Sequence, residues 1–225
     1  MTLPVRLSIG LTGGLVLLSI AACRGTPSLL PASDNPVSPT APDSFVVAFS
    51  TNKGSFAIQA HRAWSPAGVD RFYDLVRRRV YDDTRLYRVV DGFVVQFGLT
   101  NHPEANQAWQ RLGVPDEPVL QENRRGRVSY ARGGPRTRSL QLFINLADNF
   151  RLDTLAAGGV VGYPPFGEVI EGMSTIDSLN AEYGNTPAQR QDSIRTLGNA
   201  YLDRTFPNLD RIYTARVTKA WKGNR

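Results

Sequence analysis

The chain has 225 residues, of which 41% are hydrophobic and 20% are charged, a balance typical of a globular domain with a substantial core. The 26 basic and 20 acidic residues give a net charge of +6, a mild excess for a nucleic-acid-binding protein, so we expect no nucleic-acid partner. The single cysteine excludes an intramolecular disulfide and, with only two histidines, argues against a structural zinc site. An apolar run of about 18 residues is absent, which argues against a membrane-spanning helix.

Residues 1–22 have the composition of an export signal peptide. Arg6 is the only charge before Arg24, and the stretch between them is apolar and rich in small residues. The stretch ends in the sequence IAAC at residues 20–23, which resembles a bacterial lipobox, where the cysteine is lipidated and becomes the mature N-terminus. This resemblance implies an extracytoplasmic protein anchored by lipid at Cys23 to a bacterial membrane, on its periplasmic or outer surface. The alternative is an ordinary signal peptide with an incidental cysteine.

Residues 23–43 are predicted to be the lipidated cysteine and a tether. Five prolines among the serines and threonines of residues 24–43 favour an extended chain without a core of its own. At ~3.1 Å per residue, such a tether would hold a domain up to ~60 Å from a lipid surface. The remaining residues, 44–225, are predicted to form one domain.

The domain begins with two predicted strands, 44–50 and 55–59, joined by a turn at Asn52–Gly54 into a hairpin. Ser65 followed by proline predicts a helix start, and apolar residues at helical spacing extend the predicted helix over 66–79. A second short helix is predicted around 173–182. Short strands with few helices favour a barrel or a sandwich. The other predicted strands are 85–90, 93–98, 127–132, 140–145, 166–170 and 212–220.

Three segments carry the most specific pattern in the sequence. Residues 86–98 read LYRVVDGFVVQFG, residues 131–144 read ARGGPRTRSLQLFI, and LD at 152–153 is followed by FGEVIEGM at 166–173. In this order and spacing, they resemble the cyclophilin family of peptidyl-prolyl cis-trans isomerases, and the resemblance extends over roughly residues 44–220. It implies a mainly β fold, an eight-stranded antiparallel closed barrel capped by two helices, with the active site in a groove on the outer surface.

The resemblance also assigns roles to individual residues. Arg88 stands at the position of the family's catalytic arginine, and Gln96 at that of the glutamine that holds this arginine and the substrate. Ala131 and Arg132 stand where the family binds the substrate backbone, with Arg132 in place of the usual asparagine. No cofactor or metal is implied. The full set of implied substrate-binding residues is Phe93, Val94, Ala131, Arg132, Gln141, Phe143, Leu152 and Tyr163.

The chain departs from the family pattern around the groove. Arg151 stands where a tryptophan is often found, and extra residues at 154–165 make Tyr163 the nearest match to the family's usual histidine. The segments 99–126 and 183–207 resemble family-variable insertions to which the sequence assigns no chemistry.

The residue types suit the isomerisation of X-Pro bonds. Such a bond has a rotational barrier of ~18–20 kcal/mol, and at the twisted midpoint the prolyl nitrogen lone pair becomes localised and basic. A fixed guanidinium at Arg88 can donate to that nitrogen in the transition state, while apolar walls hold the proline ring. The partners implied are proline-containing segments of exported proteins, bound by a monomer. The alternative is a catalytically weak cyclophilin-like scaffold that binds such segments at the cell envelope.

Other sequence features carry less information. Taken alone, Arg88 would be an ordinary strand arginine, and His61 and His102 are interpreted as surface residues. The motifs of serine hydrolases and phosphate-binding loops are absent from the sequence. The densest basic stretch is interpreted as a solvated rim, with steering of acidic peptides or anionic surfaces as the alternative. Its members are Arg124, Arg125, Arg127, Arg132, Arg136 and Arg138.

Overall fold

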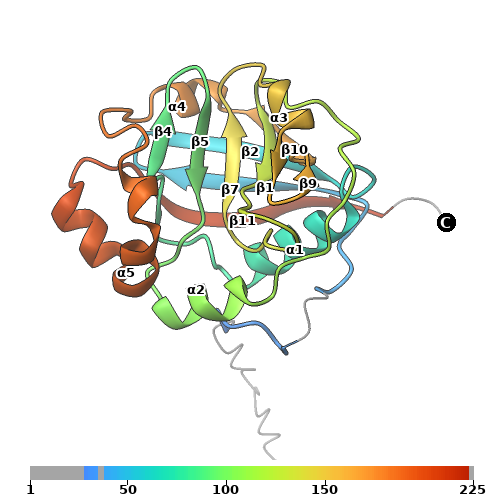
Figure 1. Cartoon of the computed structure of the whole chain (residues 1–225), viewed down its shortest axis with the longest axis horizontal. Helices are drawn as coiled ribbons and strands as arrows, with labels where there is room; N and C mark the ends of the chain where they lie inside the picture. The colour runs from blue at the N-terminus through green and yellow to red at the C-terminus, as the bar shows by residue number, and fades with distance from the viewer. Residues whose placement is uncertain (1–27, 35–37, 223–225) are drawn as a thin grey trace, which may run out of the picture.

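The structure is a computed structural model that describes residues 28–34 and 38–222 (Figure 1). In this part of the chain, nine strands form one antiparallel sheet in the order β3-β11-β1-β2-β10-β6-β7-β5-β4, and β8 and β9 form a separate hairpin. The strands of the sheet are β1 Ser44–Thr51, β2 Gly54–His61, β3 Thr84–Arg85, β4 Arg88–Val90, β5 Val94–Phe97, β6 Arg127–Tyr130, β7 Leu142–Asn145, β10 Pro165–Glu171 and β11 Arg211–Trp221. The hairpin strands are β8 Ala156–Ala157 and β9 Val160–Val161.

The sheet is curled, and the structure confirms a mainly β fold. Strands β3 and β4 lie at opposite ends of the strand order, yet only Leu86 and Tyr87 separate them along the chain. The expected strand over 85–90 is interrupted because Leu86 N–H donates to Asp210 O (2.9 Å) before the chain turns to pair with β5. The expectation of a closed eight-stranded barrel therefore differs from the structure, which is a curled nine-stranded sheet.

The predicted β1–β2 hairpin is confirmed. Thr51 pairs with Gly54 across the turn, where the Thr51 hydroxyl donates to Gly54 O (2.8 Å). Gly54 has a φ of 127°, which side-chain-bearing residues rarely adopt, and this explains the glycine at the turn. The paired strands place Phe49 and Phe56 in a stacked contact with ring centroids 4.7 Å apart, inside the main core.

Helix α1 (Pro66–Arg77) confirms the predicted helix, but its N-terminus is capped differently from the expectation. Ser65 occupies the N-cap position without a side-chain cap hydrogen bond. Instead the Glu117 carboxylate accepts from Ala67 N–H (2.7 Å) and Gly68 N–H (3.2 Å), and from the Ser65 hydroxyl. A residue of the 99–126 insertion thus satisfies the helix N-terminus.

The other helices differ more from the sequence prediction. Helix α4 (Met173–Asp177) is shorter than the predicted 173–182, because Asn180 N–H donates to the Asp210 carboxylate (2.6 Å) instead of continuing the helix. Three further helices lie in the segments 99–126 and 183–207, to which the sequence assigns no chemistry and in which it identifies no helix or strand. They are helix α2 (Pro103–Gln110), the 3₁₀ helix η1 (Pro187–Arg190) and helix α5 (Gln191–Thr205). A one-turn helix, α3 (Arg151–Thr154), precedes the β8–β9 hairpin.

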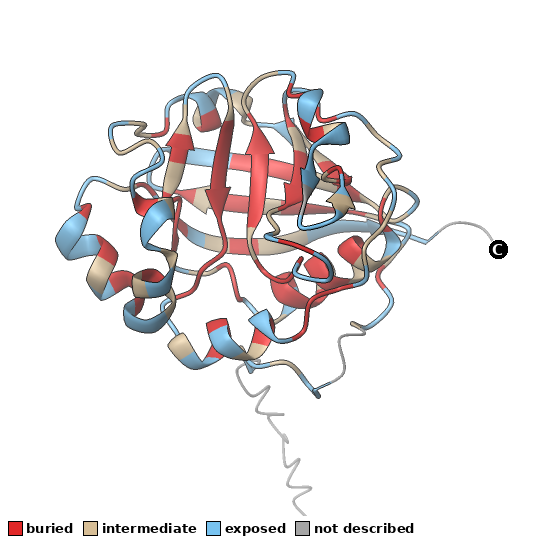
Figure 2. Cartoon of the chain, viewed as in Figure 1, coloured by how far each residue is buried: buried red, intermediate tan, exposed pale blue. Residues whose placement is uncertain are grey.

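The main core lies inside the curled sheet, whose strands are mostly buried in Figure 2. It is rich in aromatic side chains, and α1 covers it with Val69, Phe72 and Leu75. Tyr130 is buried with its hydroxyl donating to Gly68 O (2.9 Å), so the burial of this polar group is compensated. A second, smaller cluster of apolar side chains is separate from this core and is described with the site below.

The described part of the predicted tether lies on the domain. Leu29 O accepts a hydrogen bond from the Trp109 indole N–H (2.8 Å), and Leu30 O accepts one from Arg78 (2.8 Å). Ala41 N–H donates to the Asp70 carboxylate (2.9 Å). These contacts shorten the reach expected of a fully extended tether. The predicted signal peptide and Cys23 lie outside the described residues. Within the residues that the structure describes, no helix has the length and apolar character to cross a membrane.

Candidate active site

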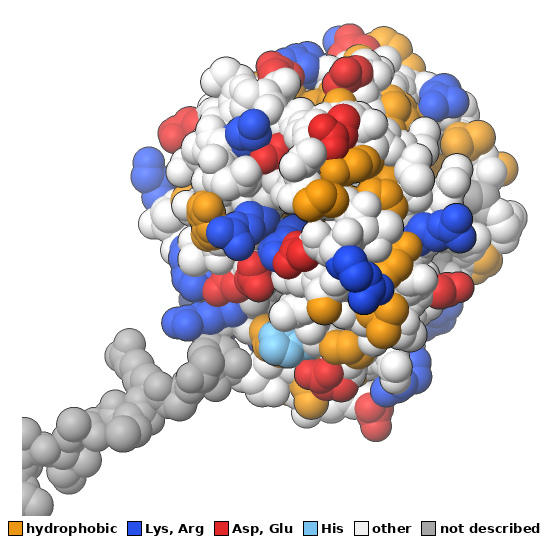
Figure 3. All heavy atoms as spheres, turned by 90° about the vertical axis from the view of Figure 1, so that its left-hand side faces the viewer, with side chains coloured by type: hydrophobic (Ala, Val, Ile, Leu, Met, Phe, Trp, Pro, Cys, Tyr) orange, Lys and Arg blue, Asp and Glu red, His pale blue; other side chains and the backbone are white. Residues whose placement is uncertain are grey.

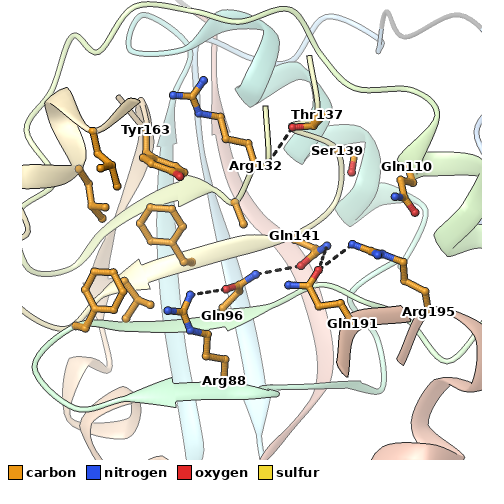
Figure 4. Close-up of a pocket in the computed structure, with 17 residues that line it drawn as sticks. Arg88, Gln96, Gln110, Arg132, Thr137, Ser139, Gln141, Tyr163, Gln191 and Arg195 are labelled. Atoms are coloured by element: carbon orange, nitrogen blue, oxygen red, sulfur yellow. Dashed lines mark hydrogen bonds between the residues drawn. The ribbon is translucent and has the colours of Figure 1, made fainter. Parts of the chain in front are cut away.

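A groove of about 550 Å³ lies on the outer face of the sheet (Figure 4). The structure brings into its lining all ten groove residues that the sequence analysis singled out. They come from β4, β5, β7 and α3, from the residues just before β5, from the chain between β6 and β7, and from the chain after the β8–β9 hairpin, so segments far apart in the sequence meet here. The lining residues that the sequence analysis did not select are Gln110, Gly133, Thr137, Ser139, Leu155, Gln191 and Arg195.

The alternation of side chains along the strands separates the groove from the core. Val94, Gln96 and Phe143 point into the groove, whereas Val95 and Ile144 belong to the main core. Successive residues of a strand point to opposite faces of a sheet, and the register pairs Gln96 with Phe143. A polar hydrogen-bonding group and an apolar wall are therefore neighbours on the same face.

Arg88 is held by two neutral acceptors. The β4–β5 register places Arg88 opposite Gln96, and the Arg88 Nη1–H donates to Gln96 Oε1 (2.9 Å). The Arg88 Nε–H donates to Asn185 Oδ1 (2.7 Å). Both acceptors are amide oxygens, so they orient the guanidinium and leave its positive charge uncompensated. Burial lowers the pKa of Arg88 from its usual value, but an arginine stays protonated in proteins.

The hydrogen bonds continue beyond Gln96 along the floor of the groove (Figure 4). The Gln96 amide N–H donates to Gln141 Oε1 (3.0 Å), which also accepts from the Tyr87 hydroxyl. The Gln141 amide N–H donates to Gln191 Oε1 (3.2 Å), and Arg195 donates to the same oxygen (2.8 Å). Helix α5 is thus connected to the Arg88–Gln96 pair by side-chain hydrogen bonds.

Beside Arg88, the groove is apolar. The Phe143 and Tyr163 rings make an edge contact with centroids 5.9 Å apart. The Arg88 guanidinium lies 5.4 Å from the Phe93 ring centroid, and the exposed Arg151 lies 4.7 Å from the same ring. These distances permit cation–π attraction, which keeps the Phe93 ring between the two arginines. The members of this apolar cluster are Val94, Phe143 and Leu152, which are buried, and Phe93, Ala131 and Tyr163, which are partly buried.

The Arg132 side chain is held by the chain around the β8–β9 hairpin. The resemblance implies that it binds the substrate backbone, but its Nη2 donates to Val160 O (2.9 Å) and to Gly162 O of the β8–β9 hairpin. Its guanidinium also lies 4.9 Å from the Tyr163 ring centroid, and its side chain is 1% exposed. The extra residues at 154–165 supply these carbonyl oxygens, so the Arg132 side chain is part of the groove wall, and its contact with a substrate stays a prediction.

The basic stretch at 124–138 is not a uniform solvated rim. Arg138 is 1% exposed and pairs with Glu117 at 2.9 Å, next to the N-terminus of α1. Arg125 pairs with Asp177 at 2.6 Å. The solvated-rim interpretation is wrong for Arg132 and Arg138, because both side chains are buried and their Nη2 groups donate to carbonyl and carboxylate oxygens brought in by the insertions.

Three of the seven lining residues that the sequence analysis missed come from the insertions at 99–126 and 183–207. Gln110 ends α2, and Gln191 and Arg195 are four residues apart on α5, the spacing that places side chains on one helix face. Without a prediction that 191–205 is helical, this spacing carried no signal. Within the described part of the chain, no three His, Cys, Asp or Glu side chains gather where they could hold a metal ion.

Comparisons with known proteins agree with this geometry. The family model described as "Cyclophilin type peptidyl-prolyl cis-trans isomerase/CLD" matches residues 46–199. The chain is 30% identical over 161 residues to peptidyl-prolyl cis-trans isomerase B of Escherichia coli (strain K12), covering 65% of this chain and 91% of that protein. It is 31% identical over 160 residues to peptidyl-prolyl cis-trans isomerase A of Dickeya dadantii (strain 3937), covering 64% of this chain and 78% of that protein.

Solved structures show the same fold. A crystal structure of a cyclophilin-type peptidyl-prolyl cis-trans isomerase of Cryptosporidium parvum is similar with a TM-score of 0.54 and 21% identity, covering 78% of this chain and 98% of that one. A second structure of that isomerase, in the presence of the dipeptide Ala-Pro, has a TM-score of 0.53 and 21% identity, covering 77% of this chain and 99% of that one. The chain therefore belongs to the family of cyclophilin-type peptidyl-prolyl cis-trans isomerases.

Proposed function

We propose that this isomerase catalyses folding outside the cytoplasm, by rotating X-Pro bonds of exported proteins in the groove around Arg88. The observation that carries the proposal is the position of the Arg88 guanidinium beside the apolar cluster, within one groove. The cluster offers a surface for a proline ring, and Arg88 offers a fixed cation at its edge.

The reaction needs no bond to be made or broken other than hydrogen bonds. In the planar amide, the prolyl nitrogen lone pair is delocalised into the carbonyl group, and rotation localises it. Arg88 uses its Nε–H and one Nη1–H on Asn185 and Gln96, so further Nη–H groups are available to donate to that nitrogen. This donation strengthens only as the bond twists, which lowers the barrier without equal stabilisation of the ground state.

The apolar side chains make that donation more effective. Leu152 and Phe143, 4% and 5% exposed, present apolar surface beside the guanidinium, and a proline ring bound on this surface would displace water from it. A hydrogen bond from a cation is stronger in such surroundings than in water. By holding the ring, the cluster also fixes the prolyl half of the bond while the acyl half rotates.

The test is an isomerase assay with the purified protein and proline-containing peptides, followed by NMR exchange or by a protease that cleaves only the trans form. We expect cis-to-trans conversion well above the uncatalysed rate, with strong loss in Arg88→Ala. A protein that binds the peptides without accelerating conversion would instead be the binding scaffold.

The scaffold alternative rests on specific departures at the rim of the groove. The Arg132 guanidinium is committed to the β8–β9 hairpin, and Arg151 presents an exposed, flexible side chain to Phe93. Both change how a peptide backbone would be held. The intact arrangement of Arg88, Gln96 and Phe143 favours catalysis over this alternative.

We also propose that Cys23 carries the lipid anchor and that the domain lies close to the membrane. The sequence at residues 20–23 supports the anchor. Five residue steps separate Cys23 from Ser28, whose carbonyl oxygen accepts a hydrogen bond from Arg78 (3.3 Å). At ~3.3–3.6 Å per residue, these steps span at most ~18 Å, much less than the ~60 Å of a free tether.

A further inference from the structure

The insertion at 183–207 reaches the guanidinium of Arg88, although the sequence assigns it no role. Asn185 lies in the turn before η1, and Gln191 begins α5. Asn185 accepts from the Arg88 Nε–H, and Gln191 ends the row of amides that begins at Gln96. Figure 4 shows this row running from Arg88 to Arg195.

The contact from Asn185 defines the orientation of the guanidinium. A guanidinium is planar, and a hydrogen bond to Nη1 alone leaves the side chain free to swing about that contact. The Asn185 oxygen, 2.7 Å from Nε, and the Gln96 oxygen, 2.9 Å from Nη1, hold the group at two separate donors. With these two donors held, the other Nη–H groups of Arg88 have a fixed orientation.

Gln191 determines the orientation of the side-chain amides in this row, that is, in which direction the oxygen of each amide points. Its Oε1 accepts from both Gln141 and Arg195, so Gln141 turns its own oxygen toward Gln96. Gln96 in turn presents its oxygen to Arg88. If Gln96 were reversed, its N–H₂ group would face the Arg88 N–H, two donors without an acceptor.

The insertion is packed firmly enough to act as a fixed support. Ile194 and Leu202 of α5 are buried in the main core. At the Gly198 kink, Asn199 N–H donates to Asn101 Oδ1 (2.9 Å), and the Asn199 amide donates to Asp83 O (2.7 Å). The turn before Asn185 is held by the edge contact of the Tyr183 and Phe206 rings, 5.2 Å apart.

The surface charge gives no indication that the insertion at 183–207 is a charged binding surface. The side of the molecule that faces the viewer in Figure 3 carries basic, acidic and apolar side chains intermixed, without a large field of one sign. The distinguishing feature of Asn185 is therefore its contact with Arg88.

We propose that Asn185 is a positioning residue for Arg88, and that Gln191 supports the same orientation through Gln141 and Gln96. The inference rests on the catalytic role proposed for Arg88 and deepens it. The insertion thus contributes to the transition-state contact without touching the proline itself.

A double-mutant cycle tests the proposal on the full chain, using Asn185→Ala, Arg88→Ala and the combination. We expect Asn185→Ala to lower kcat/KM about 3- to 10-fold, the range of one lost hydrogen bond, with little change in the Kd of a proline peptide measured by NMR titration. In the Arg88→Ala background, the same substitution is expected to change kcat/KM less than about 1.5-fold, because its effect passes through Arg88. Thr186→Ala, the exposed neighbour, is the matched control and should behave as wild type.

Two further measurements separate positioning from a general loosening of the loop. The Arg88 Nε–H signal in ¹⁵N NMR should exchange faster with water in Asn185→Ala and stay unchanged in Thr186→Ala. Gln191→Glu keeps an acceptor for both donors and should retain activity, whereas Gln191→Met, of similar length, should lose about 2- to 5-fold.

The possible failures are distinguishable. The positioning role would be overturned if Asn185→Ala lowered kcat/KM equally with and without Arg88, or if it caused no loss of kcat/KM in the wild-type background. Either result would leave the isomerase function intact. Wild-type protein without isomerase activity, or an Arg88→Ala variant as active as wild type, would instead overturn the proposed function on which the inference rests.

Discussion

Replacing Arg88 tests the mechanism most directly. Arg88→Ala removes the half-buried guanidinium that is oriented by Gln96 and Asn185. The loss of one charge-assisted contact made in the transition state is worth ~2–4 kcal/mol, which corresponds to a roughly 30- to 1000-fold fall in kcat/KM. Arg88→Lys keeps the charge but lacks the Nε–H and the planar fork, so it should recover only a small part of the activity.

The fold should tolerate the change, and this makes the kinetic result interpretable. Arg88 lines an open groove, so water can reach the amide oxygens that it leaves behind. We expect the urea midpoint and circular dichroism to remain close to wild type, with a stability loss below about 1 kcal/mol. An Arg88→Ala protein that folds normally and retains full activity would refute the assignment. Arg88→Lys with wild-type activity would show that charge alone is sufficient and that orientation is irrelevant.

Three other predictions concern the anchor, the helix cap and the response to pH. Cys23→Ser should release the protein from the membrane fraction as soluble exported protein or precursor, and mature protein that still sediments after a salt wash would contradict the lipid anchor. Glu117→Ala should cost ~3–5 kcal/mol in urea unfolding, because it uncaps α1 and leaves Arg138 buried without its partner, whereas Glu122→Ala on the exposed surface should cost little. The kcat/KM should stay flat from about pH 6 to 9, because burial lowers the pKa of Arg88 yet leaves the arginine charged throughout, and an inflection in that range would point to a different catalytic group.

The sequence predicted those parts of the fold whose signals are local. The β1–β2 hairpin and helix α1 follow from a glycine turn and from apolar residues at helical spacing, and both are confirmed. The groove residues on β5 and β7 could be placed together because strand alternation puts Val94, Gln96 and Phe143 on one face. Their catalytic and binding roles remain predictions.

What could not be predicted depends on contacts between distant segments. Helix α5 is polar, contains Gly198 and buries few apolar side chains, so its sequence has no strong helical periodicity. The cap on α1 comes from Glu117, about fifty residues away in sequence, and the early end of α4 comes from Asp210. No local pattern encodes such partners, because each depends on where the rest of the chain has already folded.

Arg132 shows how this limit affects the interpretation of a site. When a residue matches a position in the family's sequence pattern, the match predicts where its Cα lies, and the structure does place Arg132 on the groove. The direction of a long side chain, however, depends on which acceptors lie within its reach, and here the hairpin supplies Val160 O and Gly162 O while Tyr163 supplies a ring face. Arg88 has the same side chain in different surroundings, because its acceptors, Gln96 and Asn185, hold Nη1 and Nε at the open groove that Arg88 lines. Each of the two guanidinium groups donates two hydrogen bonds, so the two arginines differ in burial and not in the number of bonds: the Arg132 side chain is 1% exposed and held at the hairpin, whereas the Arg88 guanidinium is half-buried at the open groove.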